Sequence, residues 1–296
     1  NPNCPSVPLD TLIFDLRDTI IATLLPVGGT ICNGGSVAFS ITGGANYTWS
    51  PATGLSCTTC PNPIASPPTT TTYTVTVNEG ICSRSFLRQV RVSNLSLSAL
   101  VTPPLCNGGG NGAINLSLSG GIAPFNYTWT GPNGFTASSQ DITNLEEGTY
   151  TVTVTDAACT RTQSWNVIDP ATLSASLSPS MLPFCQNIAC HGGSTGAINS
   201  TIIGGTSPYA IMWTGPNGFT SGSANISSLV AGVYDMSITD AHGCITSANA
   251  SLIESPAISF SASATTDVLC FGDNIGAASS SVSGGIPPYS YSWNST

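Results

Sequence analysis

Charged residues are scarce in this chain. Its 296 residues include no lysine, five arginines and two histidines, and fourteen acids give a formal net charge of −9. A nucleic-acid-binding protein needs a basic surface to neutralise phosphates, so nucleic acid is excluded as a partner. Apolar runs of about eighteen residues are also lacking, so this segment is not expected to span a membrane. The chain opens on Asn1 without the pattern of a signal peptide, and we expect a mature or excised piece of a secreted protein.

A long-period repeat is what the chain does contain. In each copy a cysteine leads to an alternating strand pattern, a Gly-Gly pair and a tryptophan, and the tryptophans recur after 80, 84 and 80 residues (Trp49, Trp129, Trp213 and Trp293). That period is the size of a small domain and not of a solenoid coil. We therefore predict an N-terminal segment with a strand-like stretch at 1–18, a first repeat at 19–94, a second at 95–170, a third at 171–256 and a partial fourth at 257–296.

The cysteines, eleven in all, predict an oxidising, extracellular location, because intracellular proteins rarely keep so many disulfides. Three pairs have similar spacings of 50, 53 and 54 residues, and we predict one structural disulfide within each complete repeat: Cys32–Cys82, Cys106–Cys159 and Cys190–Cys244. Cys57 and Cys60 are predicted to close a local loop, since further zinc ligands at matching spacing and a βαβ setting for redox chemistry are not visible. Cys4, Cys185 and Cys270 are left without a predicted partner.

Period-two alternation of apolar and polar residues precedes each Gly-Gly pair, as in Ile114, Leu116 and Leu118. A second strand carries the tryptophan, and a third reads Tyr-x-Val-x-Val, beginning at Tyr73 and Tyr150. Short strands between turn residues predict an all-β fold of tandem immunoglobulin-like antiparallel β-sandwich modules in an elongated array. The four tryptophans are expected to anchor the cores.

Several residue groups have both a chemical and a structural interpretation. Asp240 and His242 could belong to a catalytic or metal site, and Asp156, Asp240 and Asp273 to calcium sites, but no acidic cluster surrounds them and turns are favoured. Two identical Gly-Pro-Asn-Gly-Phe-Thr segments carry Phe135 and Phe219, which either cap the core or face a sugar; turn and cap is favoured. No catalytic residue, cofactor-binding residue, metal ligand or cofactor is predicted.

The second to fourth repeats resemble a known family. Gly120-Gly121-Ile122-Ala123-Pro124-Phe125, Gly284-Gly285-Ile286-Pro287-Pro288-Tyr289 and the segment from Asn144 to Tyr150 are similar to the SprB repeat of surface adhesins in gliding Bacteroidota. The first repeat is similar to the PKD-like and immunoglobulin-like modules of the same class of secreted proteins. The resemblance implies export by the type IX secretion system and no catalytic residue. Asp10-Thr11-Leu12 and Asp18-Thr19-Ile20 resemble the O-glycosylation signal of Bacteroidota, so Thr11 and Thr19 are possible glycosylation sites.

The predicted function is that of a non-enzymatic extracellular repeat region, a stalk or filament segment of a cell-surface adhesin. Its expected partners are other surface proteins, glycans or copies of itself. Two alternatives stay open: carbohydrate-binding accessory modules of a secreted enzyme, and the subunit of a filament in which a neighbour supplies a missing strand, with Cys4 meeting Cys270.

Overall fold

The computed structural model describes residues 20–182 and 186–294. Within these residues every regular element is a β-strand, apart from two short 3₁₀ turns, η1 (Pro132–Gly134) and η3 (Pro216–Gly218). The predicted all-β, immunoglobulin-like fold is confirmed. The described residues divide into two compact units, the first holding 20–101, 113–143 and 148–166, and the second holding 102–112, 144–147, 167–182 and 186–294. This division passes through the second repeat, and the repeat boundaries stay predictions.

The first repeat has one four-stranded sheet and two short pairs. The large sheet has the order β2-β8-β7-β5, and the pairs are β1-β4 and β3-β6. The parallel pairing of β2 with β8 is a departure from the predicted antiparallel pattern. The strands are β1 Thr23–Leu25, β2 Gly29–Cys32, β3 Val37–Ala38, β4 Ser40–Thr42, β5 Asn46–Ser50, β6 Ile64–Ala65, β7 Thr71–Glu79 and β8 Cys82–Ser93.

The second and third repeats have the same topology, a three-stranded sheet and a four-stranded sheet. In the second repeat the orders are β13-β10-β9 and β12-β11-β14-β15, and in the third β16-β17-β20 and β19-β18-β21-β22. The second-repeat strands are β9 Ser96–Thr102, β10 Gly112–Ser119, β11 Asn126–Thr130, β12 Thr136–Ala137, β13 Ile142–Leu145, β14 Gly148–Thr155 and β15 Thr160–Val167. Those of the third are β16 Ser174–Pro179, β17 Gly196–Ile203, β18 Ala210–Thr214, β19 Thr220–Ser221, β20 Ile226–Leu229, β21 Gly232–Thr239 and β22 Ile245–Leu252.

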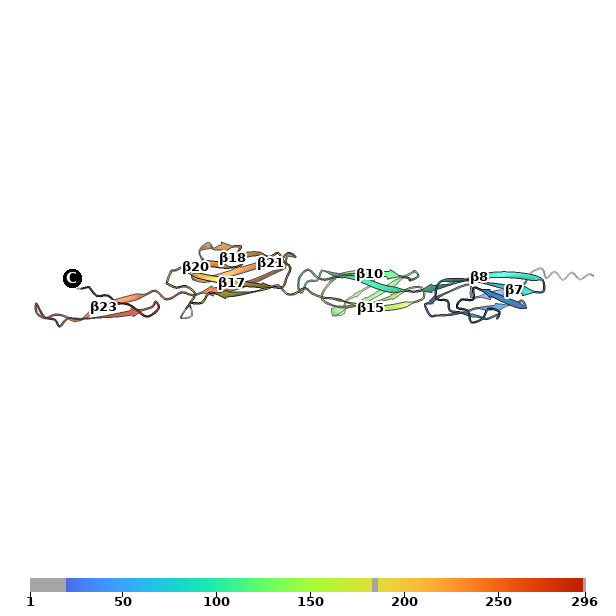
Figure 1. The fold of residues 1–296 in the computed structure, drawn as a ribbon, viewed down its shortest axis with the longest axis horizontal. Helices are drawn as coiled ribbons and strands as arrows, with labels where there is room; N and C mark the ends of the chain where they lie inside the picture. Colours follow the sequence, from blue (N-terminus) through green and yellow to red (C-terminus); the bar gives the residue numbers. More distant parts are fainter. Residues whose placement is uncertain (1–19, 183–185, 295–296) are drawn as a thin grey trace, which may run out of the picture. The chain divides into compact units, whose positions relative to one another are not determined.

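The sandwich core lies where the alternation predicts it. Trp213 on β18 is fully buried against the residues of β21 that point inward, among them Tyr234 and Met236. The two sheets of this repeat lie face to face in Figure 1, with β17 in one layer and β18 in the other. The Trp213 indole N–H donates to the Ser223 carbonyl at 2.8 Å, so the one polar atom of the core side chain is satisfied. Trp49 and Trp129 are buried in the same way.

The fourth repeat shows a two-stranded sheet of β23 (Ser259–Thr266) and β24 (Ala277–Ser283). The residues equivalent to β11 and β18, 290–294, belong to no strand in this structure. Trp293 is 58% exposed, whereas Trp129 and Trp213 are 0% exposed. The prediction that Trp293 anchors a core is therefore wrong for this structure, because no strand pairs beside it to cover the ring.

The first glycine of each Gly-Gly pair touches the segment that leads into its repeat. Gly204 has φ +70, and a Cβ there would lie 2.0 Å from the Thr172 carbonyl oxygen. Gly284 has φ +73, with the same distance to the Ala257 oxygen. Both the backbone conformation and the contact exclude a side chain. The repeated glycines thus hold each turn against the preceding linker.

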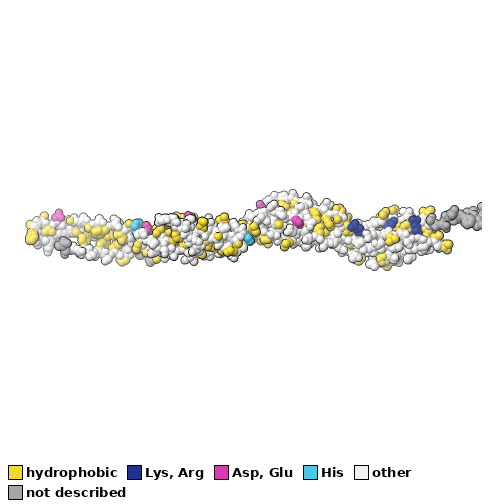
Figure 2. Space-filling view, turned by 90° about the horizontal axis from the view of Figure 1, so that it is seen from above, with side chains coloured by type: hydrophobic (Ala, Val, Ile, Leu, Met, Phe, Trp, Pro, Cys, Tyr) yellow, Lys and Arg dark blue, Asp and Glu magenta, His cyan; other side chains and the backbone are white. Residues whose placement is uncertain are grey.

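The surface carries few charges. Figure 2 shows mostly uncharged side chains, with the dark blue of arginine gathered over the first repeat, where Arg84, Arg88 and Arg91 lie on β8. Two of them reach backbone oxygens of the segment around β1: Arg84 that of Ile20 and Arg88 those of Leu24 and Pro26. Among the described residues, no helix has the length and hydropathy needed to cross a membrane.

Candidate functional site: disulfide junctions between successive repeats

The long-range disulfides join one repeat to the next. Cys32 of the first repeat is bonded to Cys159 of the second, and Cys106 of the second to Cys244 of the third. The sequence separations are 127 and 138 residues. The predicted pairs Cys32–Cys82, Cys106–Cys159 and Cys190–Cys244 are wrong, and Cys82 and Cys190 are free thiols. Each bond lies inside one of the two compact units.

The direction of the strands explains why the two cysteines of one repeat are not bonded to each other. In the third repeat, Cys190 precedes β17, and Cys244 lies in the turn between β21 and β22. β21 runs antiparallel to β18, with Thr239 opposite Ala210, so its end lies beside the start of β18, where β17 has just finished. The two cysteines are therefore at opposite ends of β17, whose eight residues span about 27 Å. A disulfide needs Cα atoms about 4.4–6.8 Å apart.

The first cysteine of each repeat occupies one recurring turn at the end of the sandwich from which the chain leaves. The residue three positions on donates its backbone N–H to the cysteine carbonyl: Gly35 to Cys32 at 2.8 Å, Gly109 to Cys106 at 2.9 Å, Gly193 to Cys190 at 2.9 Å and Asp273 to Cys270 at 3.2 Å. The residue two positions after the cysteine is in each case a glycine with positive φ (Gly34, Gly108, Gly192 and Gly272). We call this the cysteine turn. It holds four cysteines in a common local conformation, two of which are bonded.

The second cysteine follows an aspartate that organises the turn at the opposite end. Asp156 Oδ1 accepts the N–H groups of Ala158 and Cys159 at 2.8 and 2.6 Å, and Oδ2 accepts the Ile122 N–H at 2.9 Å and the Ser93 hydroxyl. Burial alone would raise the pKa of Asp156, but these hydrogen bonds outweigh it and lower the pKa to about 2. We call this the aspartate turn.

Asp240 repeats the arrangement in the third repeat. Its Oδ1 accepts the N–H groups of His242 and Cys244, both at 2.9 Å, and its Oδ2 accepts that of Thr206 at 2.9 Å. Burial again acts to raise the pKa, and the three backbone donors with the nearby His242 lower it overall. The aspartate thus ties the cysteine-bearing turn to the Gly-Gly turn, which itself lies against the linker.

At the first junction, Ser93 lies between the two bonded cysteines. Its carbonyl accepts the Asn33 N–H at 3.0 Å, next to Cys32. The same oxygen lies 3.6 Å from Cys159 Sγ, and the fully buried hydroxyl donates to Asp156. The linker between the repeats is therefore held from both sides, by hydrogen bonds as well as by the disulfide.

At the second junction, the cysteine turn contacts the strand exit of its own repeat. Gly108 donates its N–H to Asp169 Oδ2 at 2.5 Å, and the Asn107 amide donates to the Pro170 carbonyl at 3.1 Å. The next residue of the linker is Ala171, whose carbonyl accepts the N–H of Gly205 in the next Gly-Gly turn at 3.1 Å. Cys106 and Cys244, with Cα atoms 5.6 Å apart, span this linker.

The lowered pKa predicts the acid response of the first junction. Because the folded pKa of Asp156 is about 2 and the ordinary value is 3.8, its stabilisation is complete above about pH 4 and is lost as the pH falls through 2. Asp156→Asn should lower the free energy of unfolding at pH 7 by about 1–3 kcal/mol, and should flatten the acid decline. Urea unfolding followed by tryptophan fluorescence at several pH values measures both. Asp235→Asn, at an exposed position on β21, is the control; a decline in D156N as steep as in the parent chain contradicts the assignment.

The other predicted site residues have structural settings. Cys57 and Cys60 are bonded as predicted, and the Cys60 carbonyl accepts the Trp49 indole N–H at 2.9 Å. Asp273 Oδ2 accepts the Cys270 N–H at 3.1 Å within the cysteine turn. Among the described residues, no three histidine, cysteine or acidic side chains gather as a metal site would require. Thr11, Thr19, Cys4, Cys185 and the strand-like stretch at 9–16 lie outside the described residues.

The two phenylalanines of the repeated hexapeptide pack on the core tyrosines. Phe135 meets Tyr150 edge-on with centroids 5.2 Å apart, and Phe219 meets Tyr234 at 5.4 Å. Asn133 and Asn217, with φ of 53° and 57°, turn the chain before them. This geometry matches the turn-and-cap interpretation, with the rings partly covered by their own repeat.

Comparison with known proteins finds a family match for two segments of the chain. Residues 98–134 and 262–296, in the second and fourth repeats, match the family model of the SprB repeat, which confirms the resemblance for these segments. A search of curated proteins found no match.

The chain is also similar in fold to solved arrays of immunoglobulin domains. A mutated variant of three titin domains shares 15% identity over 78% of this chain and 97% of the other, with a TM-score of 0.40. The eight N-terminal immunoglobulin domains of Down Syndrome Cell Adhesion Molecule share 14% identity over 78% of this chain and 36% of the other, with a TM-score of 0.38. Three domains of the bacteriophage RB49 outer capsid protein Hoc share 12% identity over 79% and 96%, with a TM-score of 0.40.

Proposed function

We propose that this chain is a covalently braced stalk or filament segment of a cell-surface adhesin, and that its task is to resist extension. The observation that carries the proposal is the pairing of cysteines between successive repeats. A disulfide inside a domain protects that domain alone, whereas a disulfide across a linker also restricts the angle and separation of its two neighbours. Together with the match to the SprB repeat, the cysteines support an extracellular location.

The surface chemistry supports the same role. On the outer face of the second repeat, hydroxyls pair across β14 and β15, with oxygen separations of 2.8 Å for Thr151–Ser164, 3.0 Å for Thr153–Thr162 and 3.1 Å for Thr155–Thr160. A face of hydroxyls without lysine is hydrated and carries little charge. It suits contact with glycans or neighbouring uncharged chains more than with nucleic acid or anionic surfaces.

Small-angle X-ray scattering of the oxidised and the reduced protein tests the bracing. We expect the scattering curve of the oxidised chain to fit a set of conformations whose maximum dimensions have a narrow distribution, and this distribution should not change with salt. The reduced chain, whose linkers are freed, should show a broader one. Equal distributions in the two states would contradict a bracing role. Binding to a glycan array that is lost in Phe135→Ala would instead favour the carbohydrate-binding alternative.

A further inference from the structure

Cys190 is one of two unbonded members of the cysteine-turn series, and Cys270 is the other. It shares the turn of Cys32 and Cys106, with the Gly193 N–H donated to its carbonyl at 2.9 Å, and both of those cysteines are bonded to a later repeat. Cys190 itself is exposed and free. Its neighbours also repeat the bonded junction: Gly192 donates its N–H to Glu254 Oε2 at 2.7 Å, as Gly108 does to Asp169.

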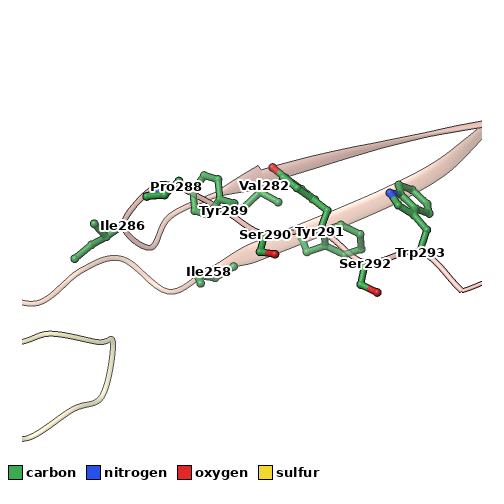
Figure 3. A pocket seen from close by; sticks show the side chains of 10 residues that line it. Ile258, Val282, Ile286, Pro288, Tyr289, Ser290, Tyr291, Ser292 and Trp293 are labelled. Carbon is green, nitrogen blue, oxygen red and sulfur yellow. The ribbon is translucent and has the colours of Figure 1, made fainter.

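A second, independent feature lies in the fourth repeat. A groove of about 360 Å³ is lined by apolar side chains of β23, β24 and the segment after the Gly-Gly turn, among them Phe260, Val282, Tyr291 and Trp293. Figure 3 shows Val282, Tyr291 and Trp293 among the side chains that line the groove beside the two strands. Phe260, Tyr291 and Trp293 are 59%, 52% and 58% exposed.

The complete repeats show what covers the equivalent surface. Beside Trp129 and Tyr127 lie Val152 and Val154 of β14, and beside Trp213 and Ile211 lie Met236 and Ile238 of β21. These are strands of alternating aromatic, aliphatic and polar residues. In the second and third repeats a bonded cysteine, Cys159 or Cys244, follows this strand within a few residues, after the aspartate turn.

The linker between the third and fourth repeats contacts both the cysteine turn of Cys190 and the repeat that holds the groove. Glu254 contacts the cysteine turn of Cys190, and two residues later the Pro256 carbonyl accepts the N–H of Gly285 in the fourth Gly-Gly turn at 2.8 Å. In the bonded junction the same succession runs from Asp169 to Ala171 and Gly205. A strand that pairs beside Trp293 therefore brings its following cysteine to the end of the fourth repeat that adjoins Cys190.

We propose that Cys190 and this groove form one covalent docking site, and that its occupant is the second half of an SprB-type repeat. The occupant is a strand of the Tyr-x-β-branched-x-β-branched type, followed by an aspartate turn and a cysteine. The strand covers Tyr291 and Trp293, and its thiol forms a disulfide with Cys190. The two thiols lose two electrons and two protons to a small-molecule or protein disulfide, which is reduced to two thiols. This inference concerns how the array is assembled and not what the array binds.

A peptide copied from this chain tests the site. The probe is residues 148–167, which hold β14, the aspartate turn, Cys159 and β15, and it is added to the full chain in a buffer of oxidised and reduced glutathione. We expect mixed-disulfide formation at Cys190 to exceed that at Cys270 and Cys82 by about tenfold or more at equal peptide concentration, measured by peptide mapping. We also expect a blue shift of tryptophan fluorescence as Trp293 is covered, with Trp293→Phe identifying the signal.

Matched variants separate the two parts of the site. A probe with Val152→Asp and Val154→Asp keeps its thiol but should lose both the preference for Cys190 and the blue shift. Cys190→Ser in the full chain should abolish the main mixed disulfide with the probe and keep the blue shift of tryptophan fluorescence. Three results would each overturn the proposal. The first is equal reaction of the probe with Cys190, Cys270 and Cys82, and the second is that the probe with Val152→Asp and Val154→Asp still reacts preferentially with Cys190. The third is that a second copy of the chain, and not the probe, covers the groove.

Discussion

Pulled from its two ends, the oxidised chain should release about a quarter of the length that the reduced chain releases between Cys32 and Cys244. The two disulfide-closed loops overlap, because Cys106 lies inside the first loop and Cys159 inside the second. The shortest covalent route from Cys32 crosses to Cys159, runs back to Cys106 and crosses to Cys244. That route contains 159 − 106 = 53 residues, against 244 − 32 = 212 along the backbone. At up to about 3.6 Å per residue, the limits are about 190 and 760 Å.

Single-molecule force spectroscopy with terminal handles measures these lengths. Cys159→Ala should leave the route through Cys106 and Cys244, with 106 − 32 = 74 residues, and Cys106→Ala the route with 244 − 159 = 85. Either bond alone therefore retains most of the protection, and only reduction or the double variant should release the whole length. Cys82→Ala is the control and should change nothing, since Cys82 is free. A longer release from C82A would show that Cys82 is bonded within the first repeat.

Trp213→Ala should destabilise the third repeat by about 3–5 kcal/mol, because it removes a fully buried aromatic side chain and leaves a cavity beside Tyr234 and Met236. It also removes the donor that satisfies the Ser223 carbonyl. That loss is comparable to the whole net stability that a core of this size supplies, about 3–5 kcal/mol. The repeat should then be largely unfolded under native conditions, within the limits that its disulfide imposes.

Trp293→Ala is the matched control, at the equivalent position of the fourth repeat. With 58% of its surface exposed, that side chain has little burial to lose, and the expected change is below about 1 kcal/mol. Amide hydrogen exchange followed by mass spectrometry resolves the two repeats in one experiment. Protection of β21 should fall in W213A and persist in W293A. Loss of protection of equal size in both variants would mean that the fourth repeat has a core of its own.

The sequence was sufficient to predict the fold because the relevant interactions are local and repeated. Alternation along Ile114, Leu116 and Leu118 gives the buried face of β10, and the tyrosine of each Tyr-x-Val-x-Val segment is buried as expected. The Gly-Gly pairs are visible in the sequence as turn signals. The structure explains why glycine is needed there, because the first glycine of each pair lies against a carbonyl oxygen of the linker.

The long-range cysteine pairing was predicted wrongly, because similar spacing was used as evidence of proximity. Spacing along the chain does not show which end of a sandwich a turn occupies. Counting strand reversals would have placed Cys190 and Cys244 at opposite ends, since an odd number of strands separates them. The buried Ser93 and its bond to Asp156 could not have been found from sequence, because they depend on how one repeat meets the linker of another.

Proteolytic peptide mapping of the unreduced protein by mass spectrometry tests the junctions most directly. After alkylation of free thiols and digestion without reductant, the structure predicts linked peptides containing Cys32 with Cys159 and Cys106 with Cys244, and alkylated Cys82 and Cys190. Linked peptides of Cys32 with Cys82, Cys106 with Cys159 and Cys190 with Cys244 would contradict the junctions and leave the repeats joined by their linkers alone.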